Sequence, residues 1–405
     1  MGFQLQDGRP DHLHGRSALK VSIADVDVAG KRILVREDLN VPLADGAIAD
    51  DARIKAAIPT LEHLAERGAM VVVMSHLGRP KGVDASLSLR PVAVALSRQL
   101  GRTVQFAEDC VGEAARAAVG RLKEGEVVLL ENVRFHPEDE ANDPEFARRL
   151  ASLGEIFVND AFAASHRAHA SVVGVAKHLP AYAGELMIAE LTALHKTLDD
   201  PKRPLLAVVG GAKVSTKVGV LEHLLEKVDA LLIGGAMANT FFRAQGFPTG
   251  TGLVEESALK DAAAVRNKGG KKLVLPVDLV CARKMEAGQE VKTMAANAVE
   301  PGWMALDIGP ESAAGFGKHI ASASTIVWNG PMGVAEIADF ARGTKAVGEA
   351  VAKSGAYTLV GGGDTVAAID ALGLAGFSHI STGGGATLEY LEGKELPGVA
   401  ILKEA

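Results

Sequence analysis

The stretch that decides the fold lies at the middle of the chain and reads Leu205-Leu206-Ala207-Val208-Val209-Gly210-Gly211-Ala212-Lys213-Val214-Ser215-Thr216-Lys217. An apolar run of strand length ends there at two glycines, and a helical pattern follows over residues 218–227. A buried strand that leads through glycines into a helix presents free backbone N–H groups, which favours binding of phosphate. The spacing of four places Lys213 and Lys217 on one face if the helix begins with them. The P-loop pattern is absent, and an ordinary strand-to-helix turn with solvated lysines is the alternative interpretation.

Composition limits the class of protein. A chain of 405 residues predicts two or three domains, and 48% hydrophobic with 23% charged residues is typical of a soluble globular protein. The net charge of −7 argues against a general nucleic-acid-binding function, and we find no apolar run long enough to span a membrane. Cys110 and Cys281 are far apart and have neither disulfide nor metal-site spacing, which favours a reducing cytoplasm. Residues 1–16 are polar and read as a loose tail without a signal peptide.

The first half of the chain alternates strands with helices. Apolar runs at residues 32–35, 69–74, 127–130 and 156–158 each lead into polar residues, and amphipathic helices are predicted between them, such as 51–67 and 90–100. This alternation predicts parallel βαβ units with right-handed crossovers.

Cationic and hydrogen-bonding side chains follow these four strands. Ligands bind at the carboxyl ends of the strands in such sheets, and the arginine fork fits phosphate and carboxylate groups. A single surface arginine is more often only solvated, but here the same residue type recurs after several strands. A zinc site at His166 and His169 lacks a third ligand. The residues predicted to line this edge are Asp38, Asn40, Arg53, His76, Arg79, Arg134, His166, Arg167 and His169.

Residues 182–198 carry apolar side chains at helical spacing and end before Pro201 and Pro204. The residues at the strand ends differ on either side of this segment, so we interpret it as an interdomain helix. A packing helix within one domain is the alternative.

Strands in the second half end in glycine. They are predicted at residues 205–209, 230–233, 273–275, 305–308, 325–328 and 359–360. Glycine lets the backbone approach a flat base and its phosphates closely. Asp364 follows three glycines and either caps the next helix, predicted at residues 366–372, or holds a Mg²⁺ ion. The absence of a Gly-x-Gly-x-x-Gly pattern argues against dinucleotide binding.

Taken together, these motifs resemble the phosphoglycerate kinase family, in order and from about Val21 to Val399. Each motif alone is compatible with chance, whereas the ordered set is specific. The matching stretches are REDLNVP (36–42), SHLGRP (75–80), ENVRF (131–135), GAKV (211–214), WNGP (328–331), GGGDT (361–365) and LEYLEGKELPG (388–398).

The resemblance implies an α/β fold of two Rossmann-like domains with parallel sheets, each a three-layer α/β/α arrangement. Residues 1–184 would bind the acid substrate, 185–200 would form the interdomain helix, and 201–389 would bind the nucleotide. The tail, residues 390–405, would return to the first domain. The implied reaction is reversible phosphoryl transfer between 1,3-bisphosphoglycerate and ADP, giving 3-phosphoglycerate and ATP (EC 2.7.2.3), in a monomeric cytoplasmic enzyme of glycolysis.

The resemblance also implies roles for individual residues. Mg²⁺ would be the cofactor, held by Asp364, and Glu336 would contact the ribose. The catalytic set would be Arg53, Lys213, Gly362 and Gly385. The acid substrate would contact Asp38, Asn40, Arg53, His76, Leu77, Gly78, Arg79, Arg134 and Arg167. The nucleotide would contact Gly211, Lys213, Lys217, Gly235, Asn329, Glu336, Gly362, Gly363, Asp364 and Thr365.

The chain departs from the commoner family pattern at residues 163–165, Ala236 and Ala335, and none of these changes removes a charged group. Two alternatives to this enzyme are a nicotinamide-dependent dehydrogenase and an inactive regulatory homologue. The first needs the dinucleotide fingerprint that is absent here. The second needs the loss of a catalytic cation, and both Arg53 and Lys213 are present.

Overall fold

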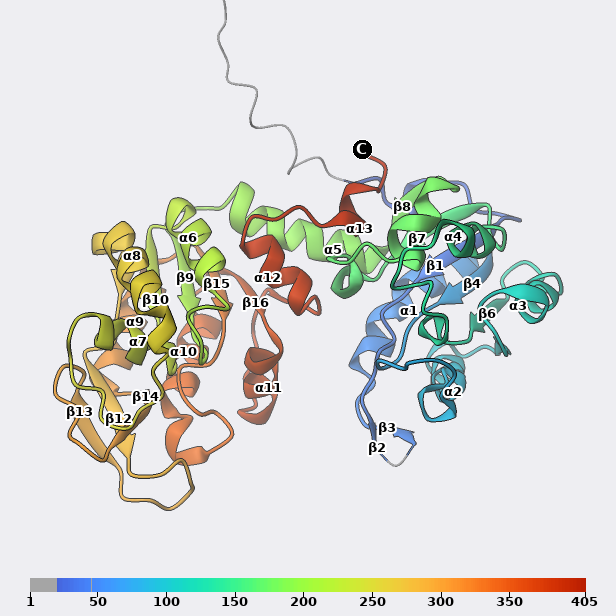
Figure 1. The fold of residues 1–405 in the computed structure, drawn as a ribbon. Coiled ribbons are helices and arrows are strands. Elements are labelled where there is room, and N and C mark those ends of the chain that lie inside the picture. Colours follow the sequence, from blue (N-terminus) through green and yellow to red (C-terminus); the bar gives the residue numbers. More distant parts are fainter. Residues whose placement is uncertain (1–19, 45) are drawn as a thin grey trace, which may run out of the picture.

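The computed structural model describes residues 20–44 and 46–405, so the tail predicted at residues 1–16 lies outside the described residues. Two α/β lobes lie side by side, and helix α5 (Glu185–Leu194) runs between them (Figure 1). We call residues 20–183 the N-terminal lobe and residues 205–391 the C-terminal lobe.

The N-terminal lobe is built on a sheet of six parallel strands in the order β5-β6-β4-β1-β7-β8. A short antiparallel hairpin, β2 (Leu43–Ala44) and β3 (Ala47–Ile48), extends from this lobe. The sheet strands are β1 (Arg32–Arg36), β4 (Met70–Met74), β5 (Val104–Ala107), β6 (Val127–Leu130), β7 (Ile156–Asn159) and β8 (Ala181–Ala183). The helices are α1 (Ala52–Glu66), α2 (Arg90–Leu100), α3 (Gly112–Val119) and α4 (Pro144–Ala151).

Successive side chains of β1 are buried on opposite faces of the sheet. Ile33 and Val35 join an apolar cluster with Ile54 of α1, whereas Leu34 joins a different cluster with Phe146 of α4. Side chains on a strand point alternately to the two faces, so a strand buried on both sides reads as an uninterrupted apolar run. The result is the predicted three-layer arrangement.

The C-terminal lobe repeats this architecture with a second six-stranded parallel sheet, in the order β11-β10-β9-β15-β16-β17. The strands are β9 (Leu205–Val209), β10 (Ala230–Ile233), β11 (Leu273–Val274), β15 (Thr325–Asn329), β16 (Tyr357–Gly361) and β17 (His379–Ile380). The helices are α6 (Val218–Lys227), α7 (Met237–Ala244), α8 (Leu259–Gly269), α9 (Pro310–Ser322), α10 (Arg342–Lys353), α11 (Gly363–Ala371) and α12 (Gly385–Leu391).

One predicted strand lies in an unexpected sheet. Residues 305–308 do form a strand, β14 (Met304–Ile308), but it pairs antiparallel with β12 (Asp278–Ala282), which also pairs with β13 (Lys292–Ala295). No helix lies among the described residues between β12 and β14 in the chain, so the crossover helix that a parallel neighbour requires is missing there. This small sheet is therefore an addition to the two parallel sheets.

The helix predicted from Tyr182 begins later than expected. Residues 181–183 form β8, which pairs with β7, and α5 starts at Glu185 after an extended Gly184. Asp160 and Thr60 of the N-terminal lobe supply the acceptors at this helix start: Asp160 Oδ1 accepts from the N–H of Met187 at 2.9 Å, and Thr60 Oγ1 from that of Glu185 at 2.9 Å. The helix is thus fixed at its first turn to the N-terminal lobe.

The end of the chain lies against the N-terminal lobe (Figure 1). The backbone N–H of Val21 donates to Lys403 at 2.9 Å, and that of Lys403 donates to Ala181 at 3.0 Å. Helix α13 (Pro397–Ala400) is held by a bond of 2.8 Å from the Gly398 N–H to the carbonyl of Ser165.

Candidate functional site

A cavity of about 340 Å³ opens at the carboxyl ends of the N-terminal strands. Leu77, which we also predicted to contact the substrate, does not line it, because its side chain is buried in the apolar core. The other predicted substrate residues all line the cavity, namely Asp38, Asn40, Arg53, His76, Gly78, Arg79, Arg134 and Arg167.

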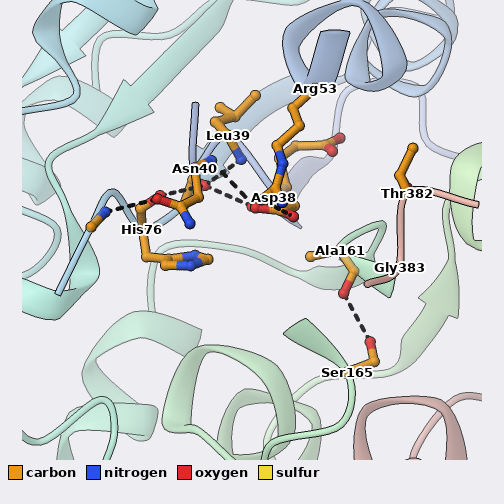
Figure 2. Close-up of polar contacts among 12 residues, drawn as sticks. Asp38, Leu39, Asn40, Arg53, His76, Ala161, Ser165, Thr382 and Gly383 are labelled. Carbon is orange, nitrogen blue, oxygen red and sulfur yellow. Dashed lines mark hydrogen bonds and ion pairs between the residues drawn. The ribbon is translucent and has the colours of Figure 1, made fainter. Parts of the chain in front are cut away.

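Asp38 and Asn40 follow β1 and organise one wall. The Asp38 carboxylate accepts from Arg53 Nη1 at 2.6 Å, which aims this α1 guanidinium across the cavity (Figure 2). Asn40 Oδ1 accepts from the Gly78 N–H at 2.8 Å, which leaves its amide NH₂ available as a donor.

His76 is held as a neutral hydrogen-bond donor. Its Nδ1 lies 3.0 Å from Nη2 of Arg36, a fully buried guanidinium that can only donate. Nδ1 must therefore accept, and the ring proton must lie on Nε2. Burial, followed by the charges of Arg36, Arg134 and Arg53, holds the pKa of His76 well below its usual value.

The remaining arginines make the cavity strongly cationic. Arg134 donates to the carbonyl of Gly78 at 2.8 Å and pairs with Glu140 at 3.2 Å, and burial lowers its pKa. Arg167 Nε donates to His166 Nε2 at 3.0 Å. Among the described residues that line the cavity, four guanidinium groups outnumber one carboxylate, Asp38, and such a lining favours a small polyanion.

The C-terminal lobe contributes glycines to the same cavity. Gly383, Gly384 and Gly385 line it, and a Cβ at Gly385 would stand 2.7 Å from His166 Cε1. Glu190, a fully buried residue of α5, holds the preceding Thr382: its carboxylate accepts from the Thr382 N–H at 2.7 Å and from its Oγ1 at 2.9 Å. Figure 2 shows the segment of Thr382 and Gly383 beside Ala161 of the N-terminal lobe.

A second cluster lies at the carboxyl edge of the C-terminal sheet, around Lys217. The Lys217 ammonium donates to the carbonyl of Gly210 at 2.7 Å and to Asn329 Oδ1 at 2.8 Å. Burial lowers the pKa of Lys217 to about 8, against the opposing attraction of Asp364. Lys217 immediately precedes α6, so the prediction that Lys213 and Lys217 share a helical turn is wrong.

Asn329 connects this lysine to the glycine turn after β16. Its Nδ2 donates to the Gly361 carbonyl at 3.1 Å, and a Cβ at Gly362 would stand 2.9 Å from that nitrogen. Gly362 has φ +92°, which favours glycine. Thr365 Oγ1 accepts from the Gly330 N–H at 2.7 Å and fixes the two turns together.

Of the remaining nucleotide residues, Gly235 packs against Gly211, whereas Lys213, Glu336, Gly363 and Asp364 are solvent-exposed. Asp364 lies within the first turn of α11, and the N-cap position belongs to Gly362 without a side-chain cap. The capping role considered for Asp364 is therefore wrong, which leaves its carboxylate free to take a hard cation such as Mg²⁺. The helix itself begins three residues earlier than predicted.

Comparison with known proteins decides the family. The sequence model of the family described as phosphoglycerate kinase matches residues 23–394. This chain belongs to the phosphoglycerate kinase family.

Individual relatives agree with this family along the chain. The phosphoglycerate kinase of Moorella thermoacetica is 54% identical over 390 residues, covering 95% of this chain and 99% of that protein. That of a Synechococcus species is 53% identical, covering 94% and 97%. The solved phosphoglycerate kinase of Coxiella burnetii has a TM-score of 0.88 at 44% identity, covering 94% and 98%. That of Pyrococcus horikoshii has a TM-score of 0.84 at 35% identity, again covering 94% and 98%.

Some residues that shape this phosphoglycerate kinase fold and its cavity escape reasoning from sequence. Arg36 reads as one more strand-end arginine, yet it is buried and sets the tautomer of His76. Glu190 reads as an ordinary helix residue, yet it reaches Thr382 in the other lobe. The triple glycine at residues 383–385, in contrast, is visible in the sequence, and Gly385 belongs to the predicted catalytic set. Among the described residues, the helices are too short or too polar to cross a membrane.

Proposed function

We propose that this chain catalyses reversible phosphoryl transfer between 1,3-bisphosphoglycerate and ADP, giving 3-phosphoglycerate and ATP, as its relatives' name describes. The observation that carries the proposal is the pair of anion-binding clusters. One is a cavity with four arginines, and the other is a glycine-lined sheet edge with a half-buried lysine. Two separate sites for anionic ligands suit a kinase with an acid substrate and a nucleotide.

The acid substrate fits the cationic cavity. Its phosphate and carboxylate would accept from Arg79, Arg134 and Arg167, and a hydroxyl would accept from His76 Nε2 and donate to Asp38. Because His76 stays neutral, it orients the substrate by donation without adding a further charge to the cavity.

The nucleotide would lie over Gly211, Gly235 and Gly362, with Lys217 and the start of α11 at its phosphates. Mg²⁺, when bound with the nucleotide, would neutralise phosphate charge, and Asp364 is the carboxylate that we assign to hold it. Glu336 is the residue we assign to the ribose hydroxyls.

Transfer needs no general base, because the acceptor in the ATP-consuming direction is a carboxylate that is already ionised. Catalysis then reduces to in-line positioning and to stabilisation of charge on the transferring group. We assign this stabilisation to Arg53 and Lys213, together with backbone N–H groups at Gly362 and Gly385.

The acid-binding cavity does not include Lys213, Lys217 or Asp364. We therefore infer that the two lobes approach one another about α5 during transfer, which also excludes water from the acyl phosphate. We further propose that the enzyme acts as a monomer in the cytoplasm, which agrees with two buried cysteines, Cys110 and Cys281, that form no disulfide.

The test is a coupled assay with 3-phosphoglycerate, ATP and Mg²⁺, in which glyceraldehyde-phosphate dehydrogenase consumes NADH. We expect turnover that is lost without Mg²⁺ and in Lys213→Ala. A folded chain that binds ADP but shows no turnover would refute the proposal and support the inactive homologue. Membership of the kinase family already sets the dehydrogenase alternative aside.

A further inference from the structure

Three side chains with metal-ligating atoms meet in the N-terminal lobe, and none of them lines the acid-binding cavity. Asp109 and Cys110 follow β5, and His136 follows β6 and the short helix η3 (Val133–Phe135). Since β5 and β6 are parallel neighbours, their carboxyl ends lie together. One carboxylate oxygen, the Cys110 Sγ and one imidazole nitrogen all lie within 4.8 Å of one another.

The Asp109 carboxylate is the centre of this cluster. Its Oδ1 lies 2.7 Å from His136 Nε2 and accepts from the N–H of Cys110 at 2.7 Å. Burial and the negative charges of Asp109 and Asp139 raise the pKa of the Cys110 thiol, so the thiol is protonated without a cation. Asp139 is fully buried and its Oδ2 lacks a hydrogen-bond partner among the described residues, although His169 Nδ1 lies 3.7 Å from it.

We propose that Asp109, Cys110 and His136 form a binding site for a divalent transition-metal cation of the zinc type, distinct from the Mg²⁺ that accompanies the nucleotide. Thiolate, imidazole and carboxylate are the ligands that such a cation selects, whereas Mg²⁺ and Ca²⁺ require oxygen ligands alone. Three protein ligands leave the fourth tetrahedral position for water.

A second cavity supplies access for the cation and that water. It has a volume of about 540 Å³, and both Asp109 and His136 line it. Glu131, which also lines it, is already occupied: its carboxylate accepts from Ser88 Oγ at 2.6 Å and from the Leu89 N–H at 2.9 Å. The fourth ligand is therefore solvent rather than this glutamate.

Binding is an exchange of protons for the cation. The thiol of Cys110 loses one proton to solvent and binds as thiolate, and a His136 ring that ligates through Nε2 carries its proton on Nδ1. The charge of the cation is balanced by the Asp109 carboxylate and the Cys110 thiolate. Because His136 directly follows the η3 turn that carries Arg134, a bound cation also restrains the end of that turn.

The experiment is a titration of the full chain, freed of any affinity tag and without nucleotide, with Co²⁺ as the probe. We expect one equivalent to bind with a thiolate-to-cobalt charge-transfer band and to release about one proton, measured by calorimetry in two buffers. Zn²⁺ should displace the Co²⁺ and abolish the band. Absence of the band in the wild-type chain would overturn the proposal.

Matched variants locate the site. Cys110→Ser should remove the band, whereas Cys281→Ser, which alters the other buried cysteine, should keep it. The opposite pattern would place the thiolate ligand elsewhere and refute the assignment.

Because Cys110 is fully buried and its variant is at risk of misfolding, His136→Asn provides an independent test. We expect its Co²⁺ affinity to fall at least about tenfold, with an unchanged circular dichroism spectrum. The exposed His178→Asn is its control and should bind as the wild type does. Equal affinity of His136→Asn and the wild type would overturn the proposal.

Discussion

Lys217 should make nucleotide binding depend on pH in a range where most lysines stay charged. Its pKa is lowered to about 8 because the ammonium is buried, where it donates hydrogen bonds to Gly210 and Asn329. A bound nucleotide places phosphate beside this group and favours its charged form. The affinity for ADP should therefore fall as pH rises through the pKa of the free enzyme.

The magnitude follows from that pKa. With a value of about 8, the protonated fraction of Lys217 falls from roughly nine tenths at pH 7 to roughly one tenth at pH 9. If only the charged form binds, the affinity for ADP falls about tenfold across this range, or about 1.4 kcal/mol.

The stability of the nucleotide-free enzyme should change in the opposite direction. Lys217 has a lower pKa in the folded chain than in the unfolded chain, where it is near 10.5. Between these values the unfolded state binds more protons, so the free energy of unfolding contributed by this group rises with pH, by at most about 1.4 kcal/mol per unit. The Lys217 contribution should therefore stabilise the empty protein as pH rises, while it weakens the nucleotide complex.

The measurement is titration calorimetry with ADP at constant ionic strength between pH 7 and pH 9, paired with urea unfolding at each pH. Lys217→Met should bind more weakly at pH 7 and should lose the additional decline towards pH 9. Lys260→Met, an exposed lysine on α8, controls for a change in net charge and should behave as the wild type. A pH dependence that is the same in Lys217→Met and the wild type would refute the reasoning.

Three further substitutions test the other cluster and the connection between the lobes. Arg53→Ala should lower kcat by about 10²-fold in the coupled assay, the scale of losing one transition-state donor, and wild-type turnover would remove Arg53 from the mechanism. Arg134→Ala should mainly raise KM for 3-phosphoglycerate, and an unchanged KM would contradict its assignment. Glu190→Gln keeps only one acceptor oxygen for Thr382 and His379 and replaces the other with an NH₂ group, so it should lower the free energy of unfolding by about 1–3 kcal/mol in urea; equal stability would show that these bonds contribute little.

The sequence predicts the two parallel sheets because their signal is local. Apolar runs such as residues 127–130 and 205–209 are buried on both faces, and each leads through polar or glycine residues into a helix. Prediction from the sequence fails where pairing between distant segments decides which structure a segment adopts. Residues 181–183 became the edge strand β8 because β7 and the C-terminal segment flank them, and neither partner is visible from local periodicity.

The candidate site, like the fold, is predictable from the sequence only in part. Residue types and their position after strands were enough to predict the arginine-lined cavity, because all parallel strands deliver their carboxyl ends to one edge. The protonation states were not predictable. The neutral form of His76 depends on the buried Arg36, and the lowered pKa of Lys217 depends on burial that only the assembled turns create.

Helix α5 explains how two separately folded sheets produce one site. Asp160, directly after β7, fixes the first turn of α5 to the N-terminal lobe, and Glu190 binds Thr382 and His379 of the C-terminal lobe. Thr382 leads directly into the glycines that line the arginine cavity. Any tilt of α5 relative to the first sheet must therefore move these glycines relative to the bound acid. Because both attachments use buried carboxylates, the helix transmits such a tilt rather than bending freely between the lobes.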